Sequence, residues 1–187
     1  MTTNTIRSLA DLTHHLATGG KPKYVLFWGH QPSKDGVVTK TCFSQWYASG
    51  FSIDGIYYAT AEHFMMAEKA RLFNDAAALQ RALIAPTPGA VKAIGREIFG
   101  FDEATWLAHR WHIVVAANVA KFSQNSALGE CLLQTGDRVL VEASPVDRIW
   151  GIGLAVDDPQ AENPYSWQGL NLLGFALMEV RARLVKL

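Results

Sequence analysis

The sequence lacks an excess of charge of either sign, because 17 basic side chains balance 17 acidic ones along its 187 residues. A chain without net charge has no overall electrostatic field with which to attract a phosphate backbone or an anionic lipid surface. Contact with DNA is therefore not indicated by charge, and any contact with nucleic acid has to be local.

Cysteine is also scarce, since Cys42 and Cys131 are the only two in the chain. They do not stand at a metal-binding spacing, and free thiols in a reducing compartment are favoured over a disulfide between them, although the sequence leaves both open. His109 and His112 lie three residues apart, but no third ligand stands at a matching spacing. We therefore expect neither a metal nor a cofactor.

Long apolar runs and the short motifs of several enzyme classes are missing as well. The N-terminal residues contain no continuous apolar stretch as long as that of a signal peptide. No segment approaches the roughly 18 apolar residues of a membrane span, so we expect a cytoplasmic protein without a membrane partner. The glycines of residues 151–153 lack the third glycine and the following helix of a dinucleotide loop. A G-x-S-x-G nucleophile motif is absent too.

The residues that are present suit one compact domain, because 49% are hydrophobic and 18% are charged. We predict an α+β fold that is mostly helical with a small β component, in a single domain over residues 1–187 with a helical extension at residues 1–20. Apolar periodicity, capping residues and turn residues predict the individual elements. Helices are expected at 5–17, 61–73, 75–85, 90–98, 103–122, 127–134 (capped by Ser126) and 170–184, and strands at 24–30, 138–144, 148–154 and in a hairpin over 51–60 that turns at Asp54-Gly55.

The predicted helix at 61–73 has charges on its apolar face. At about 100° per residue, Glu62 and Lys69 fall near the middle of that face, whereas Glu68 and Arg71 point elsewhere. The two inward charges either carry chemistry or form a buried ion pair. Two helical turns separate the two residues by about 10 Å, which is long for direct contact, and buried ion pairs are costly. We therefore favour a role in the chemistry of the protein over a buried ion pair.

Two further polar positions are ambiguous. Asp147 lies between a proline turn and the glycines of 151–153, where either a ligand approaches or the carboxylate simply binds local amides. Asn171 shares a face with Phe175 and Met178, so its amide points inward. Such an asparagine is more often a structural hydrogen bonder than a ligand contact.

Several longer motifs occur in one order along the chain. They are FSQWYASGF, DGIYYATAEHFMMAEKARLF, GRE at 95–97, KFSQN, LLQTGDRVLVEASPVDRIWGIG, WQGLNLLG and LMEVRARL. From about Tyr24 to Leu184 the chain thereby resembles the YbiA-like, or NADAR, family, although Gln45 stands where many relatives have asparagine. The resemblance implies a compact, mostly helical α+β fold and hydrolysis of a C–N glycosidic bond. It implies two kinds of substrate: ribosylamino-pyrimidine phosphates of early riboflavin synthesis, and ADP-ribose attached to guanine.

The implied reaction assigns roles to three catalytic candidates. Cleavage of a ribosyl C–N bond builds positive charge on the sugar carbon, so it needs negative charge nearby and a group that moves a proton. Glu62 and Asp147 are expected to supply these. Lys69 has two possible roles: a desolvated amine that forms a Schiff base if the ribosylamine opens, or an ammonium that holds a substrate phosphate.

The remaining site predictions concern binding. Arg96 and Lys121 are candidate phosphate contacts because both carry charge beside motifs of the family. The predicted substrate-binding residues are Trp46, Arg96, Lys121, Trp150 and Asn171. Three functions stay open: an N-glycosidase for ribosylamino-pyrimidine phosphates, a hydrolase that removes ADP-ribose from guanine in DNA, and a non-catalytic module that binds ADP-ribose or a related nucleotide. The oligomeric state is not predicted.

Overall fold

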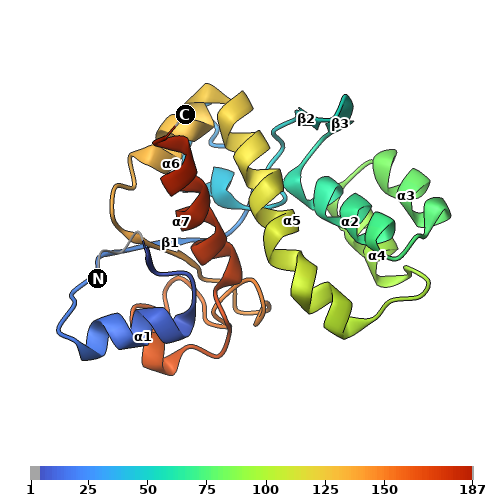
Figure 1. Ribbon diagram of the computed structural model, residues 1–187. Helices are drawn as coiled ribbons and strands as arrows, with labels where there is room; N and C mark the ends of the chain where they lie inside the picture. The colour runs from blue at the N-terminus through green and yellow to red at the C-terminus, as the bar shows by residue number, and fades with distance from the viewer. Residues whose placement is uncertain (1–4, 187) are drawn as a thin grey trace. The chain divides into compact units, whose positions relative to one another are not determined.

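The structure, a computed structural model, describes residues 5–186. The chain forms two compact units: the first comprises residues 1–44 and 127–187, and the second comprises residues 45–126. Helices dominate both units and the strands form small two-stranded sheets, so the predicted α+β fold is confirmed (Figure 1). The expectation of a single domain stays a prediction.

The first unit pairs two distant strands. Its elements are α1 (Leu9–Ala17), β1 (Tyr24–Phe27), the 3-10 helix η2 (Lys40–Phe43), α6 (Ser126–Leu133, of which Ser126 closes the second unit), β4 (Val139–Glu142), the 3-10 helix η3 (Pro164–Ser166) and α7 (Leu172–Leu184). Strands β1 and β4 run parallel, with Tyr24 opposite Val139 and Phe27 opposite Glu142. Helix α7 packs on β4 so closely that a Cβ at Gly174 would collide with the Leu140 carbonyl. This contact fixes where the start of α7 lies.

The second unit is a hairpin followed by four helices. Its elements are β2 (Phe51–Ile53), β3 (Ile56–Tyr58), α2 (Ala61–Leu72), α3 (Ala76–Leu83), α4 (Pro88–Arg96) and α5 (Glu103–Gln124). The hairpin turns at Asp54-Gly55 as predicted, with positive φ of 51° and 77° at these residues. Helix α2 contacts α3, α4 and α5, the green to yellow helices of Figure 1. It is therefore the central helix of this unit.

Burial of α2 is more complete than its wheel predicted. Every residue from Ala61 to Ala67 is buried, not only those of one apolar face. The two charges placed on the other side of the helix, Glu68 and Arg71, are partly exposed and form an ion pair. A helix with neighbours on several sides buries most of its circumference, which an apolar stripe cannot reveal.

The predicted strand at 148–154 is wrong. This segment is irregular: Ile152 N–H donates to the Glu142 carbonyl at 2.9 Å, and the Ile152 carbonyl accepts from Gln168 N–H at 2.9 Å. Gly153 has a φ of +72°, which interrupts an extended strand. A Cβ at Gly151 would lie 2.8 Å from the Glu142 carbonyl oxygen, so a glycine is needed here because another part of the backbone comes close.

Several predicted helix starts shift by one to four residues in the structure. The first helix begins at Leu9 rather than at residue 5, because Ser8 is its N-cap and accepts from Asp11 N–H. Ser126 is the first residue of α6 rather than its cap. Within residues 5–186, none of the helices combines the length and the apolar character that crossing a bilayer requires.

Candidate functional site

Glu62 is a buried carboxylate at the start of α2. Thr60 caps this helix by accepting from His63 N–H, and Glu62 is only 3% exposed. Its own N–H donates to the Gln45 carbonyl at 3.0 Å, which ties the first turn of α2 to the segment of residues 45–47. The positive end of the helix dipole favours an ionised carboxylate at this position. The local fold thus holds a carboxyl group inside the second unit.

Two buried amides, those of Gln45 and Asn118, lie in the same unit. Asn118, on α5, donates its Nδ2 hydrogens to Gln45 Oε1 at 2.8 Å and to the Val114 carbonyl at 2.8 Å. Gln45 Nε2 and Asn118 Oδ1 are buried and have no hydrogen-bond partner among the described residues. One unused donor and one unused acceptor therefore remain in the amide pair, and buried polar groups of this kind call for a complementary ligand or water.

Lys121 is a second buried charge in the same unit. It is 0% exposed and lies one helical turn after Asn118 on α5. Its Nζ is 5.7 Å from the ring centroid of Tyr47, within the range of a cation–π contact. Segment 45–47 thus joins Glu62, the amide pair and Lys121, and its Trp46 lies 5.6 Å from Lys92 Nζ, measured to the ring centroid.

Lys69 points to a different part of the unit. Its Nζ donates to the Gly95 carbonyl of α4 at 2.6 Å and lies 4.3 Å from the ring centroid of Phe101. Loss of solvent lowers the pKa of the Lys69 amine. The lowered pKa helps a nucleophilic amine, whereas the ring contact favours the ammonium. Arg96 is exposed at the end of α4.

The other predicted residues gather in the first unit, around the start of α7. Asp147 Oδ1 accepts from the N–H groups of Ile149 and Trp150, both at 2.8 Å, which is the local turn that the sequence offered as one alternative. The Trp150 carbonyl accepts from Leu173 N–H at 3.1 Å. The ligand-binding and catalytic roles of Asp147 and Trp150 stay predictions.

Asn171 is the N-cap residue of α7 and is fully buried. Its Oδ1 accepts from Glu142 N–H at 2.9 Å and its Nδ2 donates to the Leu140 carbonyl at 2.9 Å. The side-chain amide therefore fastens the helix to β4. A contact between Asn171 and substrate stays a prediction.

Three polar residues of interest were not among the predicted site residues. Asn118 could have been found from its spacing, because it shares a face of an apolar helix with Lys121, three residues later. Gln45 was noted only as a departure from the family motif. Glu142 ends β4, and its Oε2 is buried. An isolated glutamate at a strand end gives no sequence signal of burial.

Comparison with known proteins decides the family. The family model described as the NADAR domain matches residues 26–185. The chain belongs to the NADAR domain family. The resemblance that the motifs indicated from Tyr24 to Leu184 is thereby confirmed.

Individual members support this assignment. A protein of Acanthamoeba polyphaga mimivirus named N-glycosidase R617 is 39% identical over 164 residues, covering 85% of this chain and 95% of that protein. The NMR structure of the E. coli protein YbiA matches with a TM-score of 0.67 and 26% identity over 89% of this chain and 87% of that one. A Vibrio vulnificus protein named Riboflavin biosynthesis protein VVA0006 is 28% identical over 141 residues, which cover 75% of this chain and 35% of that protein.

Proposed function

We propose that this chain is an N-glycosidase that hydrolyses the C–N glycosidic bond of ribosylamino-pyrimidine phosphates, the intermediates of early riboflavin synthesis. The reaction class follows from a relative named N-glycosidase that is similar over nearly its whole length. The substrate class is supported by the family resemblance and by the name of the Vibrio relative. The structural observation that carries the proposal is the buried Glu62 carboxyl group, whose backbone N–H donates to the Gln45 carbonyl and so ties it to the residue that pairs with Asn118.

Glu62 supplies the charge that this reaction needs. As the bond from the sugar carbon to nitrogen breaks, its electron pair moves to the nitrogen and positive charge grows on the carbon. A buried carboxylate stabilises that charge more strongly than an exposed one, because little water screens it. Water then bonds to the sugar carbon, and Glu62 carries a proton from this water to the departing amine. The products are a free sugar phosphate and the aminopyrimidine.

The amide pair supports a planar base as the leaving group. Gln45 Nε2 can donate and Asn118 Oδ1 can accept, so together they suit a ring edge with adjacent C=O and N–H groups. Pyrimidinones have such an edge, and guanine has one as well. Removal of ADP-ribose from guanine therefore remains the alternative within the same reaction class, and non-catalytic binding of ADP-ribose is the alternative outside it.

A product assay separates these functions. The purified chain is incubated separately with a ribosylamino-pyrimidine phosphate and with ADP-ribosylated guanosine, and the products are resolved by chromatography. We expect ribose 5-phosphate from the first substrate at a rate well above its spontaneous decay, and little ADP-ribose from the second. Faster release of ADP-ribose would favour the guanine substrate. Binding of ADP-ribose with no turnover of either compound would show a non-catalytic module.

A further inference from the structure

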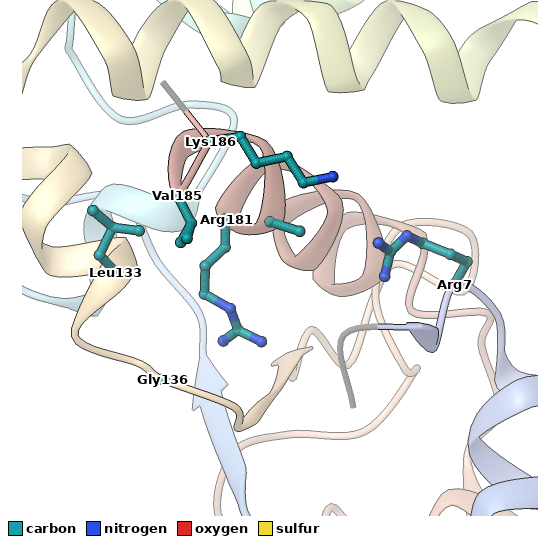
Figure 2. A pocket seen from close by; sticks show the side chains of 7 residues that line it. Arg7, Leu133, Gly136, Arg181, Val185 and Lys186 are labelled. Atoms are coloured by element: carbon teal, nitrogen blue, oxygen red, sulfur yellow. The ribbon is translucent and has the colours of Figure 1, made fainter. Parts of the chain in front are cut away.

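A cavity of about 380 Å³ lies beside the C-terminal half of α7. Its walls come from three segments of the first unit: Arg7 just before the N-cap of α1, the end of α6 with the following turn, and the end of α7 with the two residues after it (Figure 2). The lining residues are Arg7, Leu133, Gly136, Arg181, Ala182, Val185 and Lys186. All charged residues of this lining are basic, and its apolar side chains are those of Leu133, Ala182 and Val185.

Arg181 is the buried charge of this cavity. It is 3% exposed, and its Nη1 donates to Thr135 Oγ1 at 2.7 Å and to the Arg138 carbonyl at 2.9 Å. Its Nη2 is buried without a hydrogen-bond partner among the described residues. Burial, together with the smaller effects of the nearby cations Arg7 and Arg138, lowers the pKa of Arg181 to about 10, although Asp137 opposes this shift. A buried guanidinium with an unused donor can bind a further acceptor, and an anion suits its charge.

The acidic groups nearby do not fill this role. Glu179 is already shared, accepting from Arg7 Nε at 2.5 Å and from Arg183 Nε at 2.7 Å. Asp137 attracts Arg181 electrostatically but is exposed. The partial negative charge at the end of α7 opposes an anion, yet two of its last carbonyls accept from the N–H groups of residues 185 and 186. Positive charge therefore dominates around the cavity.

We propose that this cavity binds the phosphate group of a small molecule. Arg181 and Lys186 come from the end of α7 and the residues after it, and Arg7 comes from the segment before α1, which suits a tetrahedral dianion with several acceptor oxygens. Leu133, Ala182 and Val185 offer an apolar wall to the remainder of the ligand. Arg7 and Lys186 fall outside the span of residues 26–185 that the family model matches.

The test is an NMR titration of the full chain with inorganic phosphate and with ribose 5-phosphate, at constant ionic strength kept with sodium chloride. We expect saturable shifts of the Arg181 side-chain N–H and of the Gly136 and Ala182 amides with both probes. Ribose 5-phosphate should bind more tightly if the apolar wall contacts the sugar, and equal affinities would identify free phosphate as the ligand. Absence of saturable shifts, or equal shifts with chloride alone, would overturn the proposal.

Matched variants locate the binding. Lys186→Ala removes a cation that lines the cavity. Arg183→Ala removes an exposed cation of α7 that does not line the cavity. We expect Lys186→Ala to weaken phosphate binding by roughly 3- to 10-fold, as for loss of one charge-assisted contact, and Arg183→Ala to change it less than about 2-fold. Equal weakening by both variants would indicate a nonspecific ion atmosphere and overturn the proposal.

Two further controls complete the experiment. Ala10→Ser, a change on α1 away from the cavity lining, is titrated in parallel and should bind phosphate like the wild type. Glu62→Gln is titrated as well. Because Glu62 belongs to the other unit and does not line the cavity, we expect its phosphate binding to be unchanged even if the chain proves not to be a glycosidase.

Discussion

At the scale of single residues, Lys69 has the most ambiguous chemistry. Desolvation lowers the pKa of its amine, which would leave more neutral nucleophile near pH 7. Its contacts with the Gly95 carbonyl and the Phe101 ring also explain the residue as a structural link from α2 to α4 and to the segment before α5. Chemical trapping separates the two roles.

Lys69→Arg is the informative change, because arginine keeps the positive charge and the ring contact but does not form an imine. If Lys69 forms a Schiff base, substrate with borohydride should add the mass of a reduced ribosyl group to the wild-type peptide that contains Lys69, as seen by mass spectrometry. The variant should give no adduct and should lose activity by about 100-fold or more. A fully active variant and no adduct in the wild type would leave Lys69 a structural or electrostatic role.

His63 makes the stability of α2 depend on pH. Its Nδ1 lies 2.8 Å from Thr60 Oγ1 and its Nε2 lies 3.0 Å from the Ala85 carbonyl, while burial lowers the pKa below the ordinary value of 6.5. The folded imidazole therefore resists protonation while the unfolded one accepts it. Stability from this residue is complete above pH 6.5 and is lost as the pH falls below that value.

Urea unfolding at pH 7.5 and at pH 5.5 measures this effect. The wild type should lose more free energy of unfolding between the two values than His63→Gln, which keeps polar atoms near the same place but does not titrate. The exposed His112 provides a control, since His112→Gln should follow the wild type. Parallel losses in the wild type and His63→Gln would show that the buried imidazole does not couple to unfolding.

At the scale of elements, Asn171 joins α7 to β4 through two side-chain hydrogen bonds to backbone groups. It also has a φ of 53°, a left-handed conformation that asparagine tolerates better than alanine. Asn171→Ala should therefore lower the free energy of unfolding by roughly 2–4 kcal/mol, from two lost buried bonds and backbone strain. Urea denaturation measures the change. A loss below about 0.5 kcal/mol would show that these bonds contribute little.

An element was predicted correctly where the residues that determine it lie close together in the sequence. Helix α5 and the β2–β3 hairpin were predicted because Asp102 and the Asp54-Gly55 turn act within a few residues. The prediction for segment 148–154 failed because its hydrogen bonds run to residues outside it, to Glu142 and to the chain near Gln168, 10 and 16 residues from Ile152. An apolar segment with glycines has the composition of a strand, but its partners decide its shape.

The same distinction applies to the candidate site. Glu62 was predicted because a carboxylate on an apolar helical face is visible in one helix. The amide pair was missed because Gln45 and Asn118 are 73 residues apart and meet only in the folded second unit. Their unused donor and acceptor depend on geometry, which no spacing in the sequence encodes.

At the scale of the whole molecule, the family match at residues 26–185 includes residues of both units, whereas α1 lies outside it. The candidate chemistry of Glu62 and the basic cavity at Arg181 belong to different units. The balanced charge of the chain favours a small ligand over a DNA duplex for the proposed reaction. Substitutions at Glu62 and at Lys186 should accordingly affect catalysis and phosphate binding independently.

The central claim is that Glu62 performs the chemistry, and the kcat of Glu62→Gln with a ribosylamino-pyrimidine phosphate tests it most directly. Glutamine is nearly isosteric but cannot carry negative charge or move a proton, so we predict a loss of about 100-fold or more with an unchanged melting temperature. Glu68→Gln, on the same helix and paired with Arg71, should keep near-normal turnover. A folded Glu62→Gln variant with near-normal kcat would contradict the account.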